Sequence, residues 1–189
     1  MSQEEFLDRI RTSSPTALAE EFLHSEIAHI FSNSAGYKAF RDRVVTLISF
    51  TESVAVVGSG NWRYSLNPDK NFREFGEHSD VDVAIVSSAQ FHLLWEEMRL
   101  NHRRYYYALS EAQKLSLRRN SENVYGGFIS PNWIPKRSLI QTYKYKQLLN
   151  TLSDKEVRFS KVKMLFFKNT DEAIDYYARG FRAARRTRP

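Results

Sequence analysis

The sequence predicts an α/β protein that forms a single domain over residues 1–189. Short apolar runs of strand length occur at 53–58, 81–86 and 157–167. The segments around these runs place apolar residues at the three- and four-residue spacing of amphipathic helices. A chain of this length buries about 70% of its potential surface when it folds as one unit. These observations favour one sheet flanked by helices.

Helices dominate residues 1–50, which we expect to pack on the sheet as an N-terminal addition. A short amphipathic helix covers Glu4–Arg11. The pair Ser14–Pro15 supplies an N-cap followed by proline in the first turn, so a second helix is predicted over Thr16–Phe31. A third helix is predicted near Tyr37–Ser49, where apolar residues share one face.

Strands and helices alternate in the middle of the chain. Strands are predicted at 53–58 and 81–86, joined by a helical turn and a polar loop. A helix follows from Ala89 to about His102, and a short helix is predicted near 111–119. The apolar and glycine-containing segment Asn123–Ile129 is predicted to form a strand.

The last part of the chain combines a proline-rich turn, a strand and two helices. Ser130–Pro135 contains two prolines and therefore suits neither a helix nor a central strand. Residues 137–150 are predicted to be helical and 157–167 to form a strand. Asp171–Arg186 is predicted to be the last helix, within a basic C-terminal segment over 170–189.

Two carboxylates and a small-residue turn carry the strongest chemical signal. Asp80 and Asp82 alternate with valines, so in a strand both carboxylates point to the same face. Such a pair of hard oxygen ligands suits Mg²⁺, which completes its shell with water and substrate phosphates. Upstream, the turn Gly58-Ser59-Gly60 ends an apolar strand, and its backbone N–H groups can hold phosphate oxygens. Together they form a minimal set for metal-dependent phosphoryl or nucleotidyl transfer.

The run Val57-Gly58-Ser59 followed by Ser79-Asp80-Val81-Asp82-Val83 resembles the signature of the DNA polymerase β-like nucleotidyltransferase superfamily. The resemblance covers about residues 36–87. It implies a nucleotidyltransferase-like mixed β-sheet, a nucleoside triphosphate (NTP) donor and two metal ions, Mg²⁺ or Mn²⁺. It also implies that Gly58 and Ser59 contact the phosphates, while Asp80 and Asp82 hold the metals.

This sequence departs from the family pattern at two places. The spacer from Ser59 to Asp80 is longer than the family usually has. Members also commonly carry a third carboxylate on a later strand, where it serves as a metal ligand or base. The late strand Val162–Lys168 carries no acid. Glu122 and Glu156 flank predicted strands, and Glu122 is the candidate for an assisting catalytic role.

Further candidate contacts lie in the 61–78 loop and after the proline-rich turn. Arg63, Arg73 and Lys136 are candidates for binding triphosphate oxygens, alongside Gly60 of the turn. Trp62 can stack on a base or pack the loop against the body of the protein, and packing is the simpler interpretation. His78, next to the carboxylates, is interpreted as a bystander.

Charge is distributed unevenly along the chain. Residues 1–98 hold 8 Lys and Arg against 15 Asp and Glu, whereas residues 99–189 hold 20 against 7. The basic half is expected to attract a triphosphate, RNA or an acidic protein, or else to be a solvated face. Within it, basic and aromatic side chains occur together over Asn101–Tyr107. This pattern is typical of a nucleic-acid-binding groove, or of a helix end whose tyrosine side chains pack into the core.

Composition excludes several classes of site. The chain has no cysteine, so a disulfide framework, a thiolate zinc site and a cysteine nucleophile are excluded. No apolar run approaches the roughly 20 residues of a membrane span, and the first residues lack a signal-peptide pattern. We therefore expect no membrane partner and a cytoplasmic location.

The sequence thus predicts a metal-dependent nucleotidyltransferase that moves a nucleoside monophosphate from an NTP to an acceptor hydroxyl. The acceptor class stays open among RNA, protein and small molecules. By family analogy, a small stand-alone chain of this kind resembles components of bacterial toxin–antitoxin or phage-defence systems. The alternative is a catalytically degenerate module of the same fold that senses a nucleotide or binds nucleic acid or protein.

Overall fold

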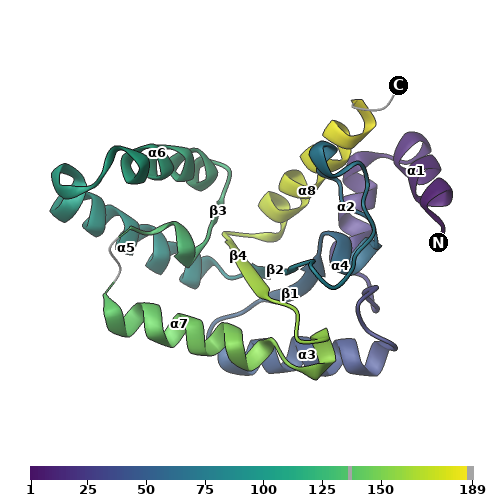
Figure 1. Ribbon diagram of the computed structural model, residues 1–189, viewed down its shortest axis with the longest axis horizontal. Coiled ribbons are helices and arrows are strands. Elements are labelled where there is room, and N and C mark those ends of the chain that lie inside the picture. Colours follow the sequence, from purple (N-terminus) through teal and green to yellow (C-terminus); the bar gives the residue numbers. More distant parts are fainter. Residues whose placement is uncertain (136–137, 187–189) are drawn as a thin grey trace.

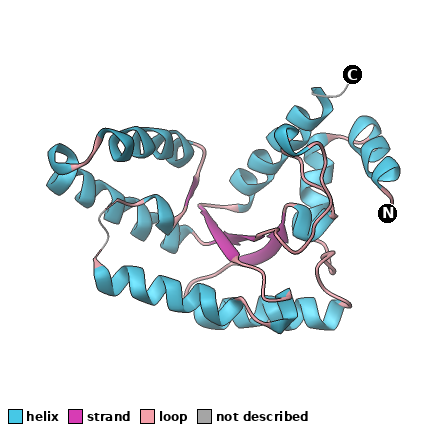
Figure 2. Cartoon of the chain, viewed as in Figure 1, coloured by secondary structure: helices cyan, strands magenta, loops and turns pink. Residues whose placement is uncertain are grey.

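A mixed four-stranded sheet lies at the centre of the computed structural model, which describes residues 1–135 and 138–186. The strand order is β1-β2-β4-β3, with β1 antiparallel to β2, β2 parallel to β4, and β3 antiparallel to β4. Helices surround the sheet (Figure 2), so the α/β class expected from the sequence is confirmed. The strands are β1 (Ser53–Val57), β2 (Val81–Val86), β3 (Phe128–Ile129) and β4 (Val162–Phe167).

Two layers of helices cover the two faces of the sheet (Figure 1). On one face, α3, α5 and α7 pack against the side chains of Val81, Val83 and Ile85. On the other face, α1, α2 and α8 pack against Ala84 and Val86. The helices of the described chain are α1 (Gln3–Thr12), α2 (Pro15–Leu23), α3 (Ser34–Leu47), α4 (Ser59–Trp62), α5 (Ser88–Tyr105), α6 (Glu111–Tyr125), α7 (Leu139–Leu152) and α8 (Thr170–Arg186).

The alternation along β2 decides which layer the carboxylates face. Because Ala84 and Val86 point towards α8, Asp82 points to that same face, two residues earlier. Asp80 precedes the strand and continues the alternation. The acidic pair therefore lies on the side of the sheet covered by α1, α2 and α8.

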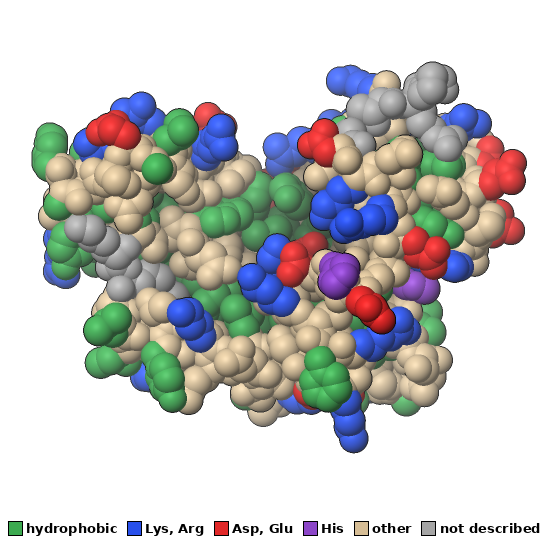
Figure 3. All heavy atoms as spheres, viewed as in Figure 1, with side chains coloured by type: hydrophobic (Ala, Val, Ile, Leu, Met, Phe, Trp, Pro, Cys, Tyr) green, Lys and Arg blue, Asp and Glu red, His purple; other side chains and the backbone are tan. Residues whose placement is uncertain are grey.

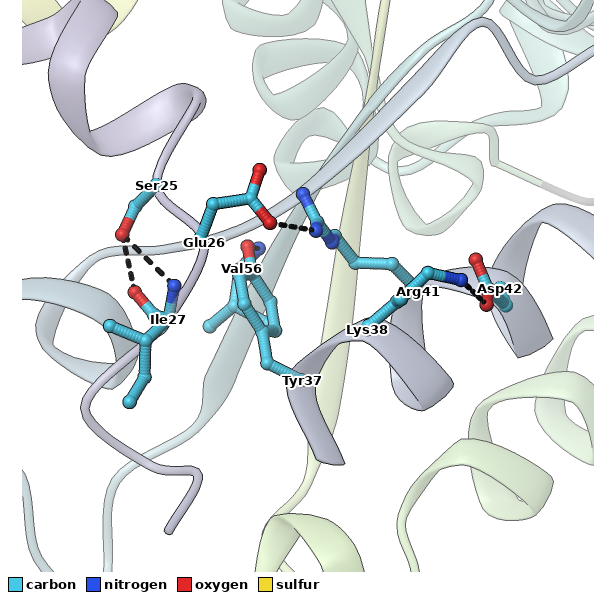
Figure 4. Close-up of polar contacts among 8 residues, drawn as sticks. All are labelled: Ser25, Glu26, Ile27, Tyr37, Lys38, Arg41, Asp42 and Val56. Atoms are coloured by element: carbon cyan, nitrogen blue, oxygen red, sulfur yellow. Dashed lines mark hydrogen bonds and ion pairs between the residues drawn. The ribbon is translucent and has the colours of Figure 1, made fainter. Parts of the chain in front are cut away.

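Side chains form hydrogen bonds with backbone groups at the outer edge of β1, where the described chain has no neighbouring strand. The fully buried Tyr37 hydroxyl accepts a hydrogen bond from the Val56 N–H at 3.0 Å (Figure 4). The Asn61 side-chain amide donates to the carbonyl groups of Val56 and Phe22, each at 2.8 Å. Arg41 covers the Tyr37 ring at 4.7 Å. These contacts protect an edge strand from pairing with other chains and hold the end of β1 in place.

Three predicted elements were wrong in their extent. The helix predicted over Thr16–Phe31 ends at Leu23, because the N–H groups of His29 and Ile30 instead donate to the carbonyls of Asn61 and Gly60. This tertiary pairing ties the segment to α4 and replaces helical hydrogen bonds. Propensity alone does not contain that information.

The other two corrections lie in the second half of the chain. The strand predicted over 123–129 shrinks to Phe128–Ile129, because α6 continues to Tyr125. The strand predicted over 157–167 begins only at Val162, after a 3₁₀ turn and two residues with positive φ. Within the described ranges, no helix is long and apolar enough to cross a membrane.

Candidate functional site

The turn and the acidic pair meet in one cavity. A cavity of about 500 Å³, called here the carboxylate cavity, is lined by Gly58, Ser59, Asp80 and Asp82. Its other walls come from Lys163 at the start of β4, from the end of α6 and from α8. Figure 3 shows the molecule hollowed between the lobe that carries α5 and α6 and the side that carries α8.

Sheet register explains why residues more than 20 positions apart become neighbours. Val57, the last residue of β1, is the antiparallel partner of Asp82. Gly58 follows with φ of +65°, a conformation that suits glycine. A Cβ atom on Gly58 would lie 3.3 Å from the Asp82 Oδ2 atom. The backbone of the turn therefore approaches the carboxylate closely, and a side chain at this position would crowd it.

The two carboxylates are unequal in their surroundings. Lys163 Nζ donates to Asp80 Oδ2 at 2.5 Å, in a half-exposed ion pair. Among the described residues, no side chain or backbone group donates a hydrogen bond to Asp82. The pKa of Asp82 is raised from 3.8 to about 6, chiefly by burial; the Lys163 charge lowers this pKa, the Asp80 charge raises it, and the Lys70 charge lowers it. The half-buried Asp82 carboxylate therefore lacks a counter-ion in direct contact among the described residues.

The β4 neighbour of Asp82 is a lysine rather than a third acid. In the parallel pairing of β2 with β4, the partner of Asp82 is Lys163. Glu122 is exposed on α6 and does not line the cavity. Glu156 forms an ion pair with Arg43 at 3.2 Å, far along the chain from the carboxylates. Glu122 and Glu156, the two candidates for a third carboxylate, therefore do not line the cavity with Asp80 and Asp82.

Asp80 and Asp82 are the carboxylates that line the cavity and could hold a divalent cation. Within residues 1–135 and 138–186, no group of three or more His, Cys, Asp or Glu side chains is arranged to hold a metal. Mg²⁺, however, is commonly held by one or two carboxylates together with substrate phosphates and water. Asp80 and Asp82 supply that number, provided that Asp80 exchanges Lys163 for the cation.

Cations from separate parts of the chain line the carboxylate cavity. Lys70 and Arg73 come from the loop after α4, Lys163 from β4 and Arg179 from α8. Four positive side chains around a cavity of this size favour a polyanionic ligand such as a triphosphate. The sequence analysis predicted Arg73 as a phosphate-binding residue but did not predict Lys163. A lysine on a strand has no local signal, and only the β2–β4 register reveals its position.

Two other predicted phosphate ligands, Arg63 and Gly60, do not line the cavity. Arg63 pairs with Glu74 at 2.7 Å and donates to the Met1 carbonyl at 3.0 Å, outside the cavity. Gly60 is buried beneath the turn, where a Cβ atom would lie 3.3 Å from the Val56 side chain. Lys136 falls outside the described residues.

Aromatic residues form the inner wall. Trp62 is 3% exposed and packs against Phe22 and Phe181, with ring centroids 5.3 Å apart in each case, so it belongs to the core as expected. Tyr176 and Tyr177 of α8 also line the cavity. The Trp62 Nε1 and Tyr177 hydroxyl groups are buried without a hydrogen-bond partner among the described residues. The wall of the cavity is therefore built from buried aromatic side chains of the core.

A scan against protein-family models, a search of curated proteins and a search of solved structures found no match to this chain.

Proposed function

We propose that the carboxylate cavity binds a nucleoside triphosphate and transfers its nucleoside monophosphate to an acceptor hydroxyl. One observation carries the proposal: the Gly58-Ser59 turn and the Asp80–Asp82 pair, which the sequence places 20 residues apart, line one cavity together with four cations. The two carboxylates would bind a divalent cation, and the surrounding Lys and Arg side chains would offset the negative charge of the triphosphate. This combination suits a metal-bound triphosphate better than a simple anion.

In this reaction the acceptor hydroxyl gives its proton to solvent water, and its oxygen forms a bond to the α-phosphorus of the NTP. The bond from the α-phosphorus to the bridging oxygen breaks, and pyrophosphate leaves. Asp80 and Asp82 would hold Mg²⁺ or Mn²⁺, which when bound neutralises phosphate charge and lowers the pKa of a coordinated hydroxyl. Lys70, Arg73 and Arg179 would offset the charge of the triphosphate.

The backbone at Gly58 has a separate role in this proposal. Because Gly58 has no side chain, a phosphate group can approach the N–H groups of the turn. The Asp80–Lys163 ion pair would open when the cation binds. Lys163 would then be free to contact a phosphate oxygen.

The test is label transfer from each α-labelled NTP, with Mg²⁺ or Mn²⁺, onto total RNA, lysate proteins and the protein itself. We expect Asp80→Asn and Asp82→Asn to lose at least about a hundredfold of the transfer rate. Asp69→Asn is the matched control, because Asp69 is exposed in the adjacent loop and does not line the cavity. Transfer by both cavity variants at the wild-type rate would refute the proposal.

The Lys163–Asp80 contact favours a second candidate function, nucleotide sensing without turnover. Lys163, the strand neighbour of Asp82, is paired with Asp80 and would compete with a cation for that carboxylate. Saturable, Mg²⁺-dependent NTP binding with no labelled product in any reaction would support this function. Product formation would exclude it.

A further inference from the structure

A second cavity, of about 560 Å³, lies between α5 and α6 and is called here the basic cavity. It borders the carboxylate cavity, because Gly127 and Glu172 line the basic cavity whereas Phe128 and Tyr176 line the other. The α6–β3 connection and the first turns of α8 therefore separate the two. Nothing in the proposed transfer reaction requires the basic cavity.

Helical periodicity builds its two main walls. Phe91, Trp95, Met98 and His102 of α5 recur at three- and four-residue spacing and line the cavity from one side. Leu117, Ser121 and Val124 of α6 recur in the same way on the other side. Apolar side chains from the two helices thus line the cavity together with polar side chains.

The charged groups at the basic cavity are mostly positive. Arg99, Arg103 and Lys168 line it, against a single acid, Glu172. Arg99 is partly neutralised by Glu96 at 3.0 Å on the same helix. Neither Arg103 nor Lys168 forms an ion pair with any residue of the described ranges. An anionic ligand would therefore meet two cations that are not already neutralised.

Aromatic side chains also line the basic cavity. The Arg99 guanidinium lies over the Trp95 ring at 4.8 Å, and both residues line the cavity. Tyr125 at the end of α6 also lines the cavity and is 93% exposed. Trp95 is half-buried and Tyr125 exposed, and aromatic rings that share a cavity with cations are the combination that holds unstacked bases and their phosphates.

From this arrangement we infer that the basic cavity is a binding site for single-stranded nucleic acid. The cations contact phosphates of the strand, and a base stacks on Trp95 or Tyr125. The volume suits a nucleotide-sized group. A single strand is favoured over a duplex, because a base can enter a space between two helices only when it is unpaired and unstacked. The adjacent carboxylate cavity would then lie within reach of the bound strand.

The test is the fluorescence anisotropy of a labelled oligoribonucleotide of eight residues, in the absence of NTP and divalent cations. Because no transfer is measured, this result is independent of the proposed catalytic function. We expect saturable binding that weakens with salt. A plot of log K against log salt concentration has a negative slope. In Arg103→Gln/Lys168→Gln the magnitude of this slope should fall by about 1.4, which corresponds to two lost phosphate contacts on a single strand.

Matched variants separate the cavity from general basic charge. Arg104→Gln/Arg119→Gln removes the same charge from α5 and α6 at exposed positions that do not line the cavity. Tyr125→Ser should weaken binding about fivefold or more through lost stacking. Tyr107→Ser should leave binding unchanged, because Tyr107 is 95% exposed and lies outside the cavity. Both tyrosines are solvent-exposed, so neither change threatens the fold.

Several results would overturn the inference. Equal losses in the cavity pair and the control pair would assign binding to diffuse surface charge. No binding of the oligonucleotide by the wild-type protein would exclude the site. Stronger binding of an acidic peptide, with displacement of the oligonucleotide, would assign the cavity to a protein partner.

Discussion

The two neighbouring cavities contain different charges and are built in different ways. The carboxylate cavity sets an acidic pair against Lys70, Arg73, Lys163 and Arg179. The basic cavity has no acidic pair and combines cations with the half-buried ring of Trp95 and the exposed ring of Tyr125. Only the carboxylate cavity has the donors for a divalent cation. The basic cavity suits an anion with a flat ring, without a metal.

Their construction explains a second difference. Strand register fixes the carboxylate cavity: Val57 pairs with Asp82, and Asp82 pairs with Lys163. Groups on paired strands hold their geometry within narrow limits. Helix side chains line the basic cavity, and exposed Tyr125 is free to rotate. We therefore expect the carboxylate cavity to be sensitive to single-atom changes and the basic cavity to tolerate varied bases.

The largest expected effect on stability comes from Asp82→Asn. Since burial raises the pKa of Asp82 from 3.8 to about 6, the ionised form destabilises the folded state above that range. Wild-type stability should therefore fall as pH rises from about 4 to 6, and Asp82→Asn should remove this fall. At pH 7.5 the variant should be more stable by up to about 3 kcal/mol.

Urea unfolding between pH 4 and 8 measures this difference. The two proteins should converge near pH 4, where wild-type Asp82 is protonated. The facing charges of Asp80, Lys163 and Lys70 are present in both proteins and cancel to first order. A constant difference across the range would show that Asp82 is not the titrating group, and the contrast between the two cavities would weaken.

A smaller effect is expected from Gly58→Ala. The added methyl group would lie 3.3 Å from Asp82 Oδ2, on a residue with φ of +65°. We expect a loss of about 1–2 kcal/mol in the free energy of unfolding, together with weaker NTP binding. Gly76→Ala is the control, because a Cβ atom there meets nothing within 4 Å. Equal stability in the two variants would contradict the close approach at the turn.

The smallest effect is expected from Lys163→Gln. The Lys163–Asp80 pair is partly exposed, so its loss should change stability by less than about 1 kcal/mol. Freed from the ion pair, Asp80 should bind Mn²⁺ a few times more tightly, which isothermal titration calorimetry measures. Lys161→Gln removes the same charge from a nearby exposed position outside the cavity. Unchanged Mn²⁺ affinity would remove Lys163 as a competitor for the cation.

Local sequence patterns predicted the helices that carry their own caps and periodicity. The apolar runs at 53–58 and 81–86 became β1 and β2 nearly residue for residue. The helix predicted over Asp171–Arg186 agrees with α8 within one residue. Where hydrogen bonds to distant segments replaced local ones, as at His29 and Ile30, the sequence prediction was wrong.

The same division holds for the functional site. The sequence by itself identified Asp80, Asp82, Gly58 and Ser59, because alternation in a strand and a small-residue turn are local properties. Only the tertiary structure put Lys163 opposite Asp82 and left Glu122 outside the cavity. Strand register and the packing of α8 set these distances through contacts between segments far apart in the chain. Local spacing therefore predicts which groups share a face, and the fold decides which charges they meet.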